Sequence, residues 1–317
     1  MITASMLGLD EAMRFGAPGV WLPAAVAEPE FAPPHASFST LYAFGDSLSD
    51  VGNDYALSLG VLPTPLIYSD GRFSNGPLWV QDLSKKLGLG AVKASLDGGR
   101  DFAYGGAETG GETLHSVNPI DLPSQLAQFV LDDPHPEANA LYTLSIGAND
   151  LQDAIPEYAS NPTAALTDIQ QAVNNETAFV SDLAALGARN FVILNVPDLG
   201  KTPADRSVAA TASNLSALYD QELNTSLAAL ATSDDLAIHL VDTYALIDEA
   251  VADPAAFGLK NVTTPVWTGN YENPFSGHLN ATGKAQNSYL FFDHLHPTAT
   301  GHMALANAAF AALGHIV

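Results

Sequence analysis

Five residues, spread over the whole chain, have the types needed for nucleophilic cleavage of an acyl bond. Ser47 lies in a Gly-Asp-Ser-Leu segment that is typical of a turn, where its hydroxyl can be exposed as a nucleophile. His296 can accept the hydroxyl proton, and Asp293, three residues earlier, can orient the imidazole. The backbone N–H groups of Ser47 and Gly106 and the side-chain amide of Asn149 can stabilise an oxyanion. Together they supply a nucleophile, a base, a group that orients the base, and three donors.

Each of these segments has a common structural explanation when it is taken alone. A serine after Gly-Asp is typically a turn residue, and Gly105-Gly106 is typical of a turn as well. Asn149 with Asp150 after an apolar run is typical of a helix cap, and a histidine near a helix start is usually a surface residue. The chemical hypothesis rests on the combination, because the segments supply complementary roles.

The elements that must position these residues alternate between short apolar runs and helical periods. Five runs are predicted to be strands: residues 41–44, 101–104, 141–146, 191–196 and 236–241. Helices are predicted over residues 77–87, 122–131, 163–186, 204–231 and 298–313. Strands separated by helices form parallel β-α-β units with right-handed crossovers. The sequence therefore predicts an α/β protein, a three-layer α/β/α sandwich with a five-stranded parallel sheet.

The carboxyl ends of the predicted strands are the expected place for a ligand. Ser47 follows the first strand, Gly106 the second and Asn149 the third. In an open parallel sheet the ligand crevice lies beyond these ends, so we expect the three residues to converge there. Residues 254–292, which are irregular and rich in Asn, Gly, Thr and Pro, are a candidate substrate loop.

The same segments resemble the sequence blocks of the GDSL/SGNH hydrolase family. In the family's order, the similar segments are residues 44–53, 103–107, 147–150 (G-x-N-D) and 293–297 (D-x-x-H-P). Residues 71–76, Gly-Arg-Phe-Ser-Asn-Gly, resemble a stretch of the branch that includes plant GDSL lipases and bacterial phospholipase- or hemolysin-like esterases. The resemblance extends from about residue 41 to residue 313, which is most of the chain.

The resemblance implies a flavodoxin-like hydrolase domain that needs no metal and no cofactor. It implies Ser47, Asp293 and His296 as catalytic residues, with Ser47, Gly106 and Asn149 forming the oxyanion hole. The serine is expected to form an acyl-enzyme that water hydrolyses. Asp101 departs from the pattern, because many relatives have Asn before Phe-Ala, and we expect this position to be structural.

The expected function is therefore that of a serine carboxylester hydrolase, an esterase or lipase acting on a small-molecule ester or lipid. Acyl transfer to an alcohol uses the same triad, and carbohydrate O-acetyl ester cleavage and a catalytically inactive binding module are further alternatives. His294 competes with His296 for the role of base, but the spacing of the D-x-x-H-P block favours His296.

Composition excludes several other classes of protein. The net charge of −24, from 11 basic and 35 acidic residues, disfavours binding to nucleic acid or to anionic membranes. The absence of cysteine excludes disulfides and thiolate chemistry. The sequence contains no uninterrupted run of 18 apolar residues, so it predicts no transmembrane helix and no stable membrane insertion. The oligomeric state cannot be read from the sequence.

Residues 1–38 differ from the rest of the chain and are predicted to be a leader or linker before a hydrolase domain at residues 39–317. Ala25-Val26-Ala27 resembles a signal-peptidase site, whereas Asp10 and Glu11 are untypical of a signal peptide. A secreted or periplasmic location and a cytoplasmic one therefore remain equally open.

Overall fold

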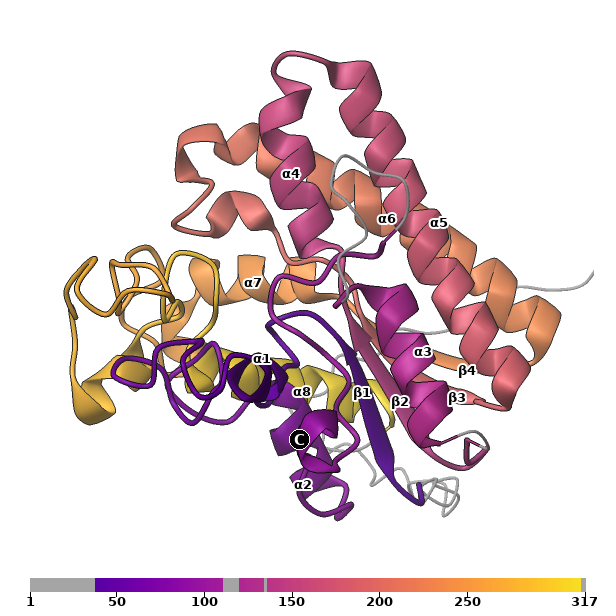
Figure 1. Cartoon of the computed structure of the whole chain (residues 1–317). Helices are drawn as coiled ribbons and strands as arrows, with labels where there is room; N and C mark the ends of the chain where they lie inside the picture. The colour runs from indigo at the N-terminus through magenta and orange to yellow at the C-terminus, as the bar shows by residue number, and fades with distance from the viewer. Residues whose placement is uncertain (1–37, 111–119, 134–135, 315–317) are drawn as a thin grey trace, which may run out of the picture. The chain divides into compact units, whose positions relative to one another are not determined.

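A parallel sheet with helices on both faces forms the framework of the residues that the computed structural model describes, which are 38–110, 120–133 and 136–314 (Figure 1). Its strands are β1 (Leu41–Gly45), β2 (Leu141–Ser145), β3 (Asn190–Leu194) and β4 (Ala237–Val241). They lie in the order β1-β2-β3-β4, and every neighbouring pair is parallel. The predicted leader lies outside the described residues apart from Phe38, so the domain boundary stays a prediction.

In the part of the chain that the structure describes, α-helices confirm the five predicted helical segments and add three others. The helices are α1 (Asn53–Leu57), α2 (Trp79–Lys86), α3 (Leu122–Asp132), α4 (Ala148–Tyr158), α5 (Pro162–Leu186), α6 (Ala209–Asp234), α7 (Thr243–Ala252) and α8 (Ala299–Ala312). Sequence patterns did not predict α1, α4 or α7. In α4, Pro156 lies inside the last turn, and proline usually marks the end of a helix. No helix within the described ranges is long and apolar enough to cross a membrane.

Alternate side chains of each strand pack into two separate cores, one on each face of the sheet. Tyr42 and Phe44 of β1 pack in one core with residues of α3, α5 and α6. Leu41 and Ala43 pack in the other with residues of α2 and α8. Because successive side chains of a strand point to opposite faces, a sheet buried on both sides needs two helical layers. This arrangement confirms the predicted three-layer α/β/α sandwich.

The second of the five predicted strands, residues 101–104, is not a regular strand, and the sheet in the described residues has four strands rather than five. This segment lies beside β1 but pairs with it through a single parallel bridge between Ala43 and Asp101. On its other edge, Asn53 Nδ2 donates to the carbonyls of Asp101 and Ala103 at 2.7 and 2.9 Å. The Asp101 carboxylate also accepts from the Ala103 N–H at 3.0 Å. On the β1 side, the Phe102 and Tyr104 N–H groups donate to the Ala43 and Gly45 carbonyls at 2.7 and 3.1 Å. The segment therefore keeps backbone bonds to β1, whereas side chains bond to the backbone groups of its other edge.

Candidate active site

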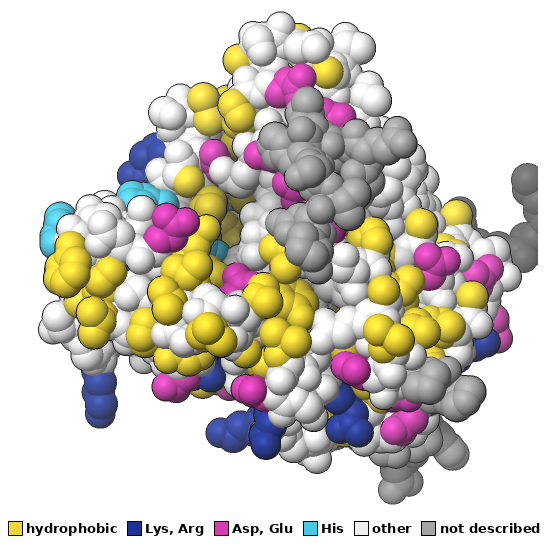
Figure 2. All heavy atoms as spheres, in the orientation of Figure 1, with side chains coloured by type: hydrophobic (Ala, Val, Ile, Leu, Met, Phe, Trp, Pro, Cys, Tyr) yellow, Lys and Arg dark blue, Asp and Glu magenta, His cyan; other side chains and the backbone are white. Residues whose placement is uncertain are grey.

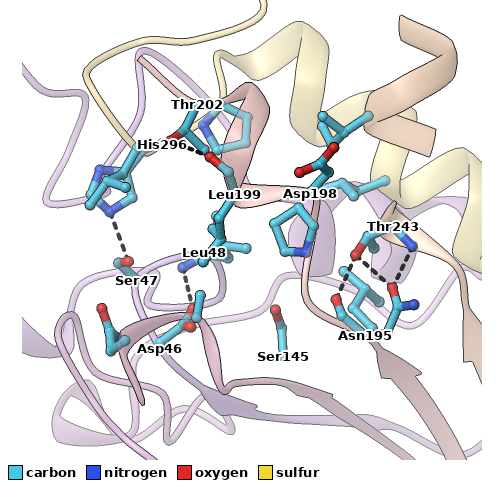
Figure 3. A pocket seen from close by; sticks show the side chains of 18 of the residues that line it. Asp46, Ser47, Leu48, Ser145, Asn195, Asp198, Leu199, Thr202, Thr243 and His296 are labelled. Atoms are coloured by element: carbon cyan, nitrogen blue, oxygen red, sulfur yellow. Dashed lines mark hydrogen bonds between the residues drawn. The ribbon is translucent and has the colours of Figure 1, made fainter. Parts of the chain in front are cut away.

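Ser47 lies on a tight turn directly after β1. Gly45 has a φ of +128°, and a Cβ atom there would lie 1.9 Å from the Ser145 carbonyl oxygen, so only glycine fits. The Asp46 N–H donates to that carbonyl at 3.1 Å, and the buried Asp46 carboxylate accepts from the Leu48 N–H at 3.0 Å. These bonds fix the turn on both sides of Ser47, whose hydroxyl points toward His296 across the cavity (Figure 3).

Ser47, His296 and Asp293 are joined by an unbroken chain of hydrogen bonds. His296 Nε2 lies 2.8 Å from Ser47 Oγ, and His296 Nδ1 lies 2.7 Å from Asp293 Oδ2. The carboxylate makes Nδ1 the protonated nitrogen, so Nε2 is free to accept from the serine hydroxyl. Asp293 Oδ1 accepts from the N–H groups of Leu295 and His296 at 2.9 and 2.8 Å. The local turn thereby holds the carboxylate against the imidazole that it orients.

The charges of this pair shift each other's pKa values. Burial alone raises the pKa of Asp293, but the adjacent His296 charge and the hydrogen bonds outweigh it and lower that pKa below its ordinary value. Burial alone lowers the pKa of His296, but attraction to Asp293, the hydrogen bond that His296 donates to it and the charge of Asp46 raise that pKa above its ordinary value. The site therefore stabilises an imidazolium, which is the state that forms when His296 takes a proton.

Two aromatic residues that the sequence did not place among the catalytic groups, Tyr68 and Phe73, contact this pair. The Tyr68 hydroxyl donates to Asp293 Oδ2 at 2.7 Å, and the contact is buried. The Phe73 ring lies 5.2 Å from the His296 ring, centroid to centroid. Phe73 belongs to the Gly-Arg-Phe-Ser-Asn-Gly stretch, which was a usable signal, whereas nothing in the sequence around Tyr68 marked it.

Gln125 of α3 is a third residue that sequence reasoning missed. Its Oε1 accepts from the Gly45 N–H at 2.9 Å, and its Nε2 donates to the Gly45 carbonyl at 2.8 Å. Both contacts are buried, so this amide fixes the end of β1 from which the Ser47 turn departs. The only usable sign was a polar residue on the inward face of a predicted helix.

The Ser47 and Gly106 N–H groups donate no hydrogen bond within the described part of the chain. The Gly105 N–H, by contrast, donates to Asp50 Oδ2 at 3.1 Å, so Gly106 rather than Gly105 has a free donor. Gly106 has a φ of +76°, is exposed, and has open space where a Cβ atom would stand. Asn149, the second residue of α4, donates through Nδ2 to the Ala107 carbonyl at 2.7 Å, which fixes its amide beside the 106–107 segment. An amide nitrogen carries two protons, so one stays available to a ligand.

Ser47, Asn149 and His296 line one pocket at the carboxyl ends of the strands, as Figure 3 shows in part. The pocket encloses about 720 Å³ of empty space, including its open mouth. Among its apolar walls are Leu48, Leu194, Pro197, Leu199, Ile247 and Phe291. Gly106 is not among the residues that line this pocket. It lies next to Ala107, whose carbonyl accepts from Asn149 Nδ2, and Asn149 lines the pocket.

His294, the competing candidate for the base, and His302 both lie away from the serine hydroxyl. His294 is exposed, and its Nε2 lies 3.0 Å from the Thr268 carbonyl oxygen rather than near Ser47. His302 is buried in α8, and burial lowers its pKa to about 3. Of the histidines in the described residues, only His296 contacts the serine hydroxyl. Those residues also contain no group of three or more metal-ligating side chains that could hold a metal ion.

The oxyanion donors can be tested through Asn149. We expect Asn149→Ala to lower kcat for an ester substrate by about 10²- to 10³-fold, because the lost donor acts on the charge that develops in the transition state. Steady-state kinetics on p-nitrophenyl butyrate measures this change. Asn190→Ala is the matched control, since its amide also donates to backbone carbonyls but lies at the start of β3. Equal losses of kcat in both variants would remove Asn149 from the oxyanion hole.

Comparison with known proteins gives similarities to a family model, to curated proteins and to solved structures. The family model described as GDSL-like Lipase/Acylhydrolase matches residues 41–309. The phosphatidylcholine-sterol acyltransferase of Aeromonas hydrophila is 26% identical over 311 residues, which cover 86% of this chain and 89% of that protein. Esterase EstA of Pseudomonas aeruginosa is 31% identical over 90% of this chain, but the match spans 48% of EstA. An acetylxylan esterase structure from Geobacillus stearothermophilus matches with 15% identity and a TM-score of 0.46, covering 89% of this chain and 97% of that one. The chain belongs to the GDSL-like lipase/acylhydrolase family.

Proposed function

We propose that this family member hydrolyses carboxylic esters with Ser47 as nucleophile, His296 as general base and acid, and Asp293 as the group that orients His296. The observation that carries the proposal is the hydrogen-bond chain from Asp293 Oδ2 through His296 to Ser47 Oγ, with distances of 2.7 and 2.8 Å. Such a chain activates a hydroxyl that is a weak nucleophile at its own pKa.

In the first half of the reaction, Ser47 Oγ attacks the ester carbonyl carbon while His296 Nε2 takes the hydroxyl proton. The carbonyl oxygen becomes an oxyanion, which accepts hydrogen bonds from the Ser47 and Gly106 N–H groups and from Asn149 Nδ2. The C–O bond to the leaving alcohol then breaks, and His296 gives its proton to the alcohol oxygen. The acyl group remains bound to Ser47 as an ester.

In the second half, a water molecule replaces the alcohol. His296 takes a proton from the water as its oxygen attacks the acyl carbon, and the same three donors stabilise the second oxyanion. The acyl–serine bond breaks, Ser47 Oγ recovers a proton from His296, and a carboxylic acid leaves. No proton is gained or lost by the enzyme over the cycle.

The pocket beside Ser47 is our proposed compartment for the acyl chain. Its apolar walls include Leu48, Leu199 and Ile247 of α7, which come from three different segments. Apolar walls with a few polar groups close to the reacting atoms are typical of small-ligand sites. This placement supports an ester or lipid substrate and leaves the alcohol portion at the mouth.

Acyl transfer is a second candidate, because one relative is named a phosphatidylcholine-sterol acyltransferase. Both reactions use the same acyl-enzyme and differ only in whether water or an alcohol removes the acyl group. The test is turnover of p-nitrophenyl butyrate with and without added hexanol, with all products quantified. Hydrolysis releases one butyric acid for each nitrophenol, and transfer releases hexyl butyrate instead. No turnover of any ester from acetate to palmitate would contradict both.

A further inference from the structure

Two neighbouring loops, residues 57–66 and 271–279, carry a concentration of exposed large hydrophobic side chains. They hold seven of the fourteen such side chains found among the described residues, with Leu59 92%, Phe275 87% and Leu66 72% exposed. The members, which we name the apolar rim, are Leu57, Leu59, Val61, Leu66, Tyr271, Phe275 and Leu279. Figure 2 shows hydrophobic side chains gathered on the side of the molecule where Figure 1 draws these loops. Exposed patches of this kind typically mark interaction sites.

The apolar rim is also almost free of charge. The 57–66 loop contains no charged residue, and the 271–279 loop contains one, Glu272, whereas the whole chain carries 35 acidic and 11 basic residues. A surface that is strongly acidic elsewhere therefore has a neutral area at these loops. Net negative charge disfavours approach to an anionic surface, but it leaves an electrically neutral apolar surface accessible.

Direct contacts join the apolar rim to the proposed catalytic residues. The Thr64 N–H donates to the Tyr271 carbonyl at 2.9 Å, which ties the two loops together. The Tyr271 ring lies 5.4 Å from the Phe73 ring, and the Phe73 ring lies 5.2 Å from the His296 ring. Two aromatic contacts thus separate the apolar rim from the base of the triad.

We propose that the apolar rim docks the protein onto a zwitterionic phospholipid surface, an inference that rests on the proposed ester hydrolysis. Leu59 and Phe275 protrude almost fully from loops, so they can insert separately among acyl chains as interfacial side chains do. Lipid ester bonds lie just below such a surface. Because Tyr271 and Phe73 connect the apolar rim to His296, a protein seated by the apolar rim holds the triad close to that surface, whereas a docking site far from the triad does not.

A double variant, Leu59→Asn with Phe275→Ser, removes the two most exposed members of the apolar rim. Asparagine is suited to position 59, because Leu59 has a φ of +58° and asparagine tolerates this left-handed conformation better than most residues. Leu131→Ser is the matched control, since Leu131 is 82% exposed but lies on α3, outside both loops. Vesicle binding is measured in a Ser47→Ala background, so that the lipid is not consumed.

Flotation with phosphatidylcholine vesicles tests the proposal. The double variant is expected to bind about 100-fold more weakly than its parent, because it loses the transfer of two large apolar side chains into lipid. With Ser47 restored, its kcat/KM for soluble p-nitrophenyl butyrate should stay within about twofold of the parent, and Leu131→Ser should change neither quantity.

Unchanged vesicle binding in the double variant, or an equal loss in Leu131→Ser, overturns the proposal. The proposal is also overturned if the parent is a dimer and the double variant is a monomer that binds vesicles as well as the parent does. Failure of the parent to hydrolyse soluble esters would instead refute the proposed function, which separates the two claims.

Discussion

Ser47→Ala is expected to lower kcat/KM for p-nitrophenyl butyrate by about 10⁴-fold or more, because loss of a nucleophile removes the covalent route altogether. The variant should fold normally. Among the described residues, Ser47 Oγ hydrogen-bonds only to His296 Nε2, and the turn around it is held by Asp46 and its neighbours. Circular dichroism and thermal unfolding compare the folds, and steady-state kinetics at saturating and low substrate gives the rate loss.

The matched control is Ser49→Ala, two residues further along the same turn. Ser49 Oγ is buried and accepts from the Trp79 indole at 3.1 Å, so its removal costs about 1–3 kcal/mol of unfolding free energy. It does not contact His296, so kcat should stay near that of the parent. Comparable rate losses in the two variants would mean that activity depends on the shape of the turn and not on the Ser47 hydroxyl.

Asp293→Asn is expected to lower kcat by about 10⁴-fold and to move the acid limb of the pH–rate profile to lower pH. The neutral amide cannot favour the Nδ1–H tautomer or stabilise the imidazolium, which accounts for the rate loss. The sign of the pH shift follows from the raised pKa of His296, because activity requires neutral His296 and is lost as pH falls through that pKa. Without the Asp293 charge the pKa drops, so the loss begins at a lower pH.

Tyr68→Phe is the matched control for this prediction. It removes the hydroxyl that donates to Asp293 Oδ2 at 2.7 Å but keeps the Asp293 charge and its contact with His296. We expect about a tenfold loss of kcat or less, with the acid limb near that of the parent. The pH–rate profile of kcat/KM from pH 4 to 9 measures both variants. An acid limb in Asp293→Asn that stays in place or moves to higher pH would contradict the assigned role of Asp293.

Much of the proposed site could be predicted from the sequence because its chemistry lies at strand ends. Parallel strands bring their carboxyl ends to one edge of a sheet, so Ser47 after β1 and Asn149 after β2 were expected to be neighbours, and both line one pocket. Asp293 and His296 follow no such rule. They lie more than 240 residues from Ser47 in the sequence, so their place beside it could be predicted only from the D-x-x-H-P resemblance.

The supporting residues could not be predicted for a physical reason. Tyr68 meets Asp293 across 225 positions of sequence, and Gln125 meets Gly45 across 80. A single phenol or amide has no periodicity and no motif, so its partner is decided only by how the loops and helices pack. The prediction of a strand at residues 101–104 was wrong for a related reason. The segment keeps backbone bonds to β1 on one edge, but the Asn53 and Asp101 side chains bond to the backbone groups of its other edge, which an apolar run alone does not reveal.

The most direct test of the central claim is to map where a fluorophosphonate probe attaches. We expect one covalent adduct per chain, located on Ser47 by peptide mass spectrometry, and loss of ester hydrolysis in proportion to labelling. We also expect slower labelling in Asp293→Asn, because His296 then activates the hydroxyl less well. Labelling of a different residue in step with inactivation, or full ester hydrolysis by protein that carries the adduct on Ser47, would contradict the central claim.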